Sequence, residues 1–182
     1  IGTLGGEKFM HRVWTTGSSS SANYDVGAQA DLNGDGIKDL VFAYSYPDPT
    51  SYVTSHEAAY IYDPTVSQYK KAGTGFYASY ASIPDEAYPV YQGTPRFVSW
   101  VDVNGDGLDD ILSLSQKGSE DGNAVYLNNG SGFARSTSYS NSVSGIQATG
   151  IENNQQRQRG VKVLDVNGDG LPDIVQAYNG ST

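Results

Sequence analysis

The chain has 182 residues, with 20 acidic and 11 basic side chains, a net charge of −9 at pH 7 and no cysteine. This length allows one domain with a hydrophobic core, and the absence of cysteine excludes disulfide bonds. We expect no nucleic-acid partner, because no basic patch is present, and no membrane insertion, because no apolar segment is long enough to span a bilayer.

Short runs rich in β-branched and aromatic residues predict strands along most of the chain. A strand candidate at residues 9–14 is followed by a serine-rich stretch at 18–21, which predicts a loop. No segment shows the periodicity of an amphipathic helix, so we predict an all-β fold. In chain order, further strands are expected at residues 40–44, 58–62, 68–71, 97–101, 111–114, 124–127, 132–134, 161–164 and 174–178.

A nine-residue loop occurs three times, at residues 31–39, 102–110 and 165–173. Each copy places side-chain oxygens at positions 1, 3, 5 and 9, a glycine at position 6 and an aliphatic residue at position 7. This is the arrangement of a loop folded around a hard cation, in which position 7 contributes its backbone carbonyl. The candidate metal ligands are Asp31, Asn33, Asp35, Ile37 and Asp39 in the first loop, Asp102, Asn104, Asp106, Leu108 and Asp110 in the second, and Asp165, Asn167, Asp169, Leu171 and Asp173 in the third.

The three carboxylates at positions 1, 5 and 9 of each loop repel one another. At a separation of about 5 Å and an effective dielectric constant of about 20, each pair costs roughly 3 kcal/mol, or on the order of 10 kcal/mol per loop. A divalent cation converts this repulsion into attraction. Oxygen ligands favour calcium or magnesium over zinc or copper, and magnesium usually retains several waters, so we expect about three calcium ions. The alternative is ordinary Asn-Gly and Asp-Gly hairpin turns, which the threefold repetition of every acid disfavours.

The loops differ from EF-hands, which end in a glutamate at position 12. Here that position holds Phe42, Ser113 and Gln176, and the flanking segments read as strands. Each loop is therefore predicted to join two antiparallel strands. The strand that follows the first loop is apolar on both faces and should be covered on both sides.

Equivalent aspartates lie 71 residues apart between positions 31 and 102, and 63 apart between positions 102 and 165. Each period has room for four strands, which is the composition of a propeller blade. The loops, the strands after them and the hairpin at 124–133 resemble FG-GAP/VCBS-type repeats, the calcium-loop blades of integrin α-chain propellers and of many secreted bacterial proteins. Residues 127–133 and 159–175 are also similar to propellers of bacterial toxin-complex B and Rhs-type proteins.

The resemblance covers most of residues 24–182 and implies one β-propeller-type module over residues 1–182. We expect repeats at about 24–92, 93–150 and 151–182, with residues 1–23 as a candidate blade-completing strand. Closed propellers usually have about four to eight blades. Three blades leave three alternatives open: part of a larger propeller, an open stack that assembles with copies of itself, or an unusual compact β domain.

The sequence favours a non-enzymatic role, because the histidines His11 and His56 belong to no recognisable catalytic motif. Calcium loops with dissociation constants of about 10⁻⁴ to 10⁻³ M would be filled outside the cell. We therefore expect a secreted module with a structural, adhesive or assembly role, whose partner is a cell-surface protein, a glycan or a second copy of the chain. The alternatives are a carbohydrate-binding or glycan-active propeller, favoured by a tyrosine cluster at residues 77–91, and a shell segment of a bacterial toxin complex.

Overall fold

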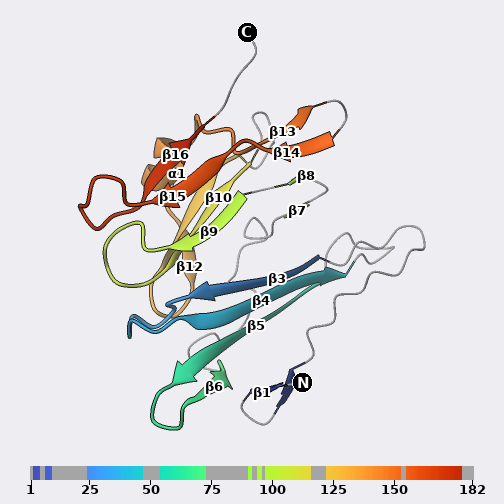
Figure 1. The fold of residues 1–182 in the computed structure, drawn as a ribbon, viewed down its shortest axis with the longest axis vertical. Helices are drawn as coiled ribbons and strands as arrows, with labels where there is room; N and C mark the ends of the chain where they lie inside the picture. The colour runs from blue at the N-terminus through green and yellow to red at the C-terminus, as the bar shows by residue number, and fades with distance from the viewer. Residues whose placement is uncertain are drawn as a thin grey trace.

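The computed structural model describes residues 2–4, 7–9, 24–46, 54–72, 90–91, 94–95, 97–115, 122–152 and 155–177. Strands dominate these residues, and they form antiparallel sheets (Figure 1). The predicted all-β class is confirmed. No helix in the described part of the chain is long and apolar enough to cross a membrane.

Two four-stranded sheets carry most of the fold, and each is a meander in which neighbours in sequence are neighbours in space. The first blade contains β3 (Tyr24–Ala30), β4 (Asp39–Tyr46), β5 (Thr54–Asp63) and β6 (Gln68–Lys71). The second blade contains β9 (Phe97–Val101), β10 (Asp110–Leu114), β11 (Ala124–Asn128) and β12 (Phe133–Arg135). The third loop joins β15 (Val161–Leu164) to β16 (Asp173–Gln176), and these two strands form a separate hairpin.

Three small hairpins or pairs accompany the blades. They are β1 (Gly2–Leu4) with β2 (Glu7–Phe9), β7 (Val90–Tyr91) with β8 (Thr94–Pro95), and β13 (Thr149–Glu152) with β14 (Gln155–Gln158). Of the strand predicted at 9–14, only Phe9 lies within the described residues, where it ends β2. Its role in completing a blade therefore stays a prediction.

The hydrophobic core consists of two layers, one on each face of the second blade. The first layer packs Ala30, Leu32 and Val41 of the first blade against the second blade, including Ile111 and Tyr126. Trp100 and Phe133 at its border meet edge to face, with ring centroids 5.6 Å apart.

The second layer packs the opposite face of the second blade, including Leu112 and Val125, against Val161, Val163 and Ile174 of the β15–β16 hairpin. Every residue of β10 is buried, because this strand has a neighbouring layer on both faces. We expected such two-sided burial for the strand after the first loop. There, Leu40 is half-buried and Val41 is buried, and the side chains from Phe42 onward lie outside the described set.

Residues Thr137–Ser142 form the short helix α1, which the sequence analysis did not predict. Its sequence, TSYSNS, carries no apolar stripe, so periodicity could not reveal it. Hydrogen bonds to neighbouring groups hold it in place. The Ser136 side chain accepts a bond from the Tyr139 N–H at 3.4 Å, and the Ser140 hydroxyl accepts one from the Val125 N–H at 3.0 Å.

Candidate metal sites

The three acidic loops occupy equivalent places, between β3 and β4, between β9 and β10, and between β15 and β16. All three project from the same side of the molecule, at the left of Figure 1. As predicted, each loop joins two antiparallel strands. The fifteen residues that the sequence assigned to metal binding therefore lie in three separate loops at equivalent places in the fold.

The acid at position 1 organises the turn. The Asp31 carboxylate accepts hydrogen bonds from the Gly34 and Gly36 N–H groups, both at 2.7 Å. Asp102 and Asp165 repeat this pattern with the glycines at 105 and 107 and at 168 and 170. These six glycines have φ between 76° and 90°, a region that glycine adopts without a Cβ clash.

The residues at positions 3 and 5 hold each other. In the first loop, the Asn33 carboxamide donates to Asp35 at 3.0 Å and accepts from the Asp35 N–H at 3.0 Å. The Asp35 carboxylate also accepts from the Ile37 N–H at 2.8 Å. The other two loops contain the same three bonds. The side-chain oxygens thus fix the backbone of each loop.

The acid at position 9 connects each loop to the rest of its blade. Asp39 accepts from the Leu32 N–H at 3.0 Å and from the Tyr62 N–H, on β5, at 2.8 Å. Asp110 accepts in the same way from Val103 at 2.9 Å and from Asn128, on β11, at 2.7 Å. Both carboxylates are fully buried. Asp173 keeps the bond to its own loop, from the Val166 N–H at 3.0 Å, and is half-buried.

Burial and charge set the ionisation of these acids. Desolvation raises the pKa of Asp110 to about 6, and repulsion from Asp106 and Asp102 adds to the increase, while the two backbone hydrogen bonds oppose it. Desolvation likewise raises the pKa of Asp39. In the exposed third loop, the Gly170 and Gly168 N–H groups lower the pKa of Asp165.

The chain matches the model of the FG-GAP-like repeat over residues 31–113 and 102–176. It belongs to the FG-GAP-like repeat family. Each match begins at the first aspartate of one loop and continues through the next, so the unit contains a loop pair with the strands between them. Comparisons with curated proteins and with solved structures found no match. The narrower similarity to toxin-complex propellers stays a prediction.

The FG-GAP-like loops fit a hard cation by their donor chemistry. Each carries three carboxylates at ligand positions. The one described ion pair within the loops joins Lys38 to Asp109, and both of these residues hold position 8, which is not a ligand position. The described residues contain no ready-made cluster of three or more acidic or histidine side chains in metal-binding geometry. Most of the loop carboxylate oxygens instead accept backbone N–H bonds. Calcium binding by these loops therefore stays a prediction.

Sequence reasoning missed the residues that join one FG-GAP-like repeat to the next. The Asp109 carboxylate accepts from the Asp31 N–H at 2.7 Å and pairs with the Lys38 ammonium at 2.5 Å. The Asp109 N–H donates in turn to the Asp31 carbonyl at 2.7 Å. Asn128 is buried and donates to the carbonyls of Leu32 and Asp109, at 3.2 and 3.3 Å. The one available signal was the acid at position 8, which only the second loop has.

Position 7 takes part in the contact between neighbouring loops, which the sequence did not reveal. A Cβ built on Gly34 would lie 3.2 Å from the Leu108 Cδ2, and one on Gly105 would lie 3.2 Å from the Leu171 Cδ2. The aliphatic side chain of each later loop therefore rests on the position-4 glycine of the loop before it. The same contact therefore joins the first loop to the second and the second loop to the third.

A cavity of about 260 Å³ opens beside the third loop. Its lining includes the apolar residues Leu112, Val143 and Ile174 and the acidic residues Asp169 and Asp173. It lies between the second blade, α1 and the β15–β16 hairpin. Val103 of the second loop also lines this cavity, so the cavity borders both the second and the third candidate metal sites.

Proposed function

We propose that this FG-GAP-like chain is a calcium-binding β-propeller-type module that acts outside the cell in binding or assembly and catalyses no reaction. The observation that supports calcium most strongly is the repeated loop, with three carboxylates and no basic side chain at a ligand position. Positions 1, 3, 5, 7 and 9 of each loop would hold the ion. Bound calcium would neutralise the carboxylates and fix the loop between its strands.

The buried acids strengthen this proposal. Asp39 and Asp110 tie their loops to the third strand of each blade, yet burial opposes their ionisation. A nearby divalent cation favours the ionised form and removes this conflict. Modest calcium affinity suits the extracellular space, where calcium is about millimolar. Extracellular placement is thus part of the same proposal.

The first test measures thermal unfolding by calorimetry in about 1 mM calcium and in excess chelator. Three sites filled at about ten times their dissociation constant would add about 4 kcal/mol, because each contributes RT ln(1 + [L]/Kd). For a chain of this size, that corresponds to an increase in Tm of about 10 °C. An unchanged Tm would contradict the calcium proposal.

The second test is a matched pair of variants. Asp35→Asn, Asp106→Asn and Asp169→Asn together remove one charge per loop and keep a carbonyl oxygen for the position-7 N–H. We expect the calcium-dependent rise in Tm to fall by more than half. Asp63→Asn removes a single charge at the end of β5, outside the loops, and should retain the full rise.

The two alternative functions also stay predictions. The tyrosine cluster that favours a carbohydrate partner lies largely outside the described residues, and only its last member, Tyr91, falls in a described strand. A shell role in a toxin complex rests on sequence resemblance alone. A glycan array and a reducing-sugar assay that are both blank would remove the carbohydrate alternative.

A further inference from the structure

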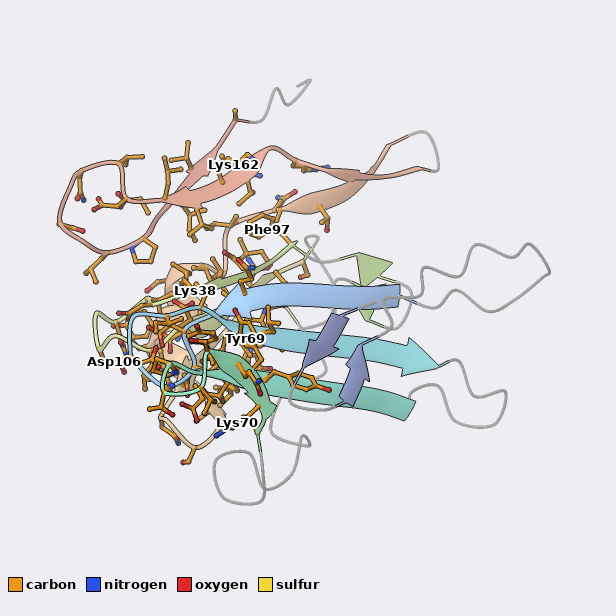
Figure 2. All side chains as sticks on the ribbon, turned by 60° about the horizontal axis from the view of Figure 1, so that its bottom comes forward. Lys38, Tyr69, Lys70, Phe97, Asp106 and Lys162 are labelled. Carbon is orange, nitrogen blue, oxygen red and sulfur yellow. The ribbon has the colours of Figure 1, made fainter. Side chains whose placement is uncertain are left out.

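The first two loops are joined by a reciprocal pair of hydrogen bonds between Asp31 and Asp109. The Asp109 N–H donates to the Asp31 carbonyl, and the Asp31 N–H donates to the Asp109 carboxylate, both at 2.7 Å. Both residues are buried, at 7% and 5% exposure. Figure 2 shows the labelled Lys38 and Asp106, one from each of these loops, at the same end of the stacked sheets. The backbone of the first loop is therefore fixed in part by the second.

Two peptide groups follow one another through this joint. The first carries the Leu108 carbonyl, a candidate ligand of the second loop, and the Asp109 N–H, which donates to the Asp31 carbonyl. The second carries that Asp31 carbonyl and the Leu32 N–H, which donates to the Asp39 carboxylate at 3.0 Å. A peptide group is planar and trans, so its carbonyl and its N–H turn together. A candidate ligand of one loop is thus connected to a candidate ligand of the other through two hydrogen bonds.

Asn128 provides a second connection between the same two loops. Its N–H donates to Asp110, a candidate ligand of the second loop, at 2.7 Å, and its carboxamide donates to the Leu32 carbonyl of the first loop at 3.2 Å. Asn128 is 2% exposed. Because water does not reach these groups, a rotation of either loop would leave buried polar atoms without partners, which is unfavourable. The two loops are therefore held in one mutual arrangement.

The third loop cannot form this joint with the second. Pro172 holds its position 8, the place of Asp109 in the second loop. Proline has neither a backbone N–H nor a carboxylate, so it can make neither bond. The side-chain hydrogen bonds described for the third loop join its own residues to one another. The contact of this loop with the second is apolar, between Leu171 and the place of Gly105. The second loop thus has a hydrogen-bonded neighbour on one side only.

We propose that Asp109 is a positioning residue that couples the first two loops, so that calcium in either one raises the calcium affinity of the other, while the third loop binds calcium independently. When the second loop is filled, its Leu108 carbonyl is polarised, and the N–H of the same peptide becomes a stronger donor to Asp31. The next peptide passes this effect to Asp39. The coupling acts equally in both directions, because linkage between two binding sites is reciprocal.

This inference rests on the calcium binding proposed above and specifies how two of the sites are regulated. The test follows each site separately by NMR of the ¹⁵N-labelled chain as calcium is added. The amides of Gly36, Gly107 and Gly170 donate to the position-1 carboxylates of the first, second and third loops, so each reports on one site. Gly36 and Gly107 should shift together, along a curve steeper than a single-site isotherm. Gly170 should follow a single-site isotherm.

A matched pair of variants separates coupling from the loss of a nearby charge. Asp35→Asn weakens the first loop and should lower the calcium affinity of the second loop by about fivefold or more, the lower end of typical coupling between sites. Asp169→Asn makes the same substitution in the third loop, the other neighbour of the second, and should leave that affinity unchanged. Equal losses of affinity in the two variants would overturn the proposal. This comparison leaves the joint itself intact.

Asp109→Pro tests the joint directly, because it gives the second loop the position-8 residue of the third and removes both bonds to Asp31. In this background, Asp35→Asn should no longer change the calcium affinity of the second loop. If Asp109→Pro does not fold, the comparison of Asp35→Asn with Asp169→Asn still decides between coupled and independent sites.

A calcium-free measurement keeps this inference separate from the calcium proposal. In chelator, Asp109→Pro should speed amide exchange at Gly34 and Gly36, which Asp31 holds, by about twofold to tenfold, the effect of losing one ordinary hydrogen bond. Exchange at Gly168 should not change. Unchanged exchange at Gly34 and Gly36 would overturn the positioning role of Asp109. Saturable binding along three independent isotherms refutes the coupling alone, whereas no calcium-dependent shift at any of the three loops refutes the calcium proposal and the coupled binding with it.

Discussion

Asp110 and Asp165 show how the place of a loop in the stack changes the pKa of an aspartate. Asp110 is fully buried beneath β11, and the loss of water raises its pKa to about 6. Asp165 is exposed on the third loop, where backbone N–H groups lower its pKa. Both are candidate ligands, but only the buried acid opposes its own ionisation in the absence of a cation.

The raised pKa of Asp110 predicts a pH dependence for the calcium-free protein. Its folded-state pKa, about 6, exceeds the ordinary value of 3.8, so its contribution to stability is fully present below pH 3.8 and is lost as pH rises through 6. Asp39 acts in the same direction. We expect the Tm in calcium-free buffer to fall by a few degrees between pH 5 and pH 7, measured by calorimetry.

Two variants separate Asp110 from the other acids. Asp110→Asn cannot ionise, so the fall in Tm between pH 5 and pH 7 should shrink. Asp63→Asn should leave the fall unchanged, because hydrogen bonds from Lys70 and Thr65 lower the pKa of the Asp63 carboxyl to about 2, below this window. A rise in the Tm of the wild type between pH 5 and pH 7 would show that another titrating group dominates the pH dependence of stability.

At the scale of elements, each loop both closes its own hairpin and contacts its neighbour. The position-4 glycine has a positive φ and lies beneath a leucine of the following loop in the first two repeats. The position-6 glycine also has a positive φ but meets nothing within 4 Å. Both glycines therefore need a positive φ, but only the position-4 glycine contacts a leucine of the next loop.

This difference predicts a comparison of four alanine variants. Gly34→Ala and Gly36→Ala should each cost about 1–2 kcal/mol through backbone strain. Gly34→Ala should cost about 1 kcal/mol more, because Leu108 must move from the new methyl group. Gly168→Ala and Gly170→Ala in the third loop should cost equal amounts in dilute solution, measured by urea unfolding. Equal costs for the first pair would mean that the leucine contact contributes nothing.

The elements that sequence predicted well are those with local signals. The strands at 97–101 and 161–164 were placed at their observed bounds, because large apolar residues alternate next to an unmistakable loop. β3 was not assigned a range. Its sequence, YDVGAQA, has small residues where it packs against the second blade, and its strand form depends on seven-residue pairing with β4.

In the candidate metal sites, too, the local features were predictable from the sequence and the long-range contacts were not. The repeated side-chain oxygens identified all three loops and their glycines, since each bond within a loop joins residues close in sequence. The roles of Asp109 and Asn128 could not be predicted, because their partners in the first loop are 78 and 96 residues away. Only the stacking of the two blades brings these groups together.

For the whole molecule, the order of the sheets sets where the structure should open first. The second blade has a core layer on each face, while the β15–β16 hairpin has one covered face and one open face. It is also a two-stranded unit, which is marginal in isolation. Its cohesion therefore depends on the second core layer and, under the proposed function, on calcium in the third loop.

In dilute, calcium-free solution, the rate of amide hydrogen exchange should follow the number of faces of each strand that the core covers. Amides of β10 should exchange slowest, because they open only when both core layers separate. Those of β15 and β16 should exchange at least tenfold faster, since loss of one layer is sufficient. Under the proposed function, calcium should slow exchange in the β15–β16 hairpin first. Uniform exchange across β10 and β16 would instead mean that the stack unfolds as one unit, so that the exposed face of the hairpin does not let it open independently.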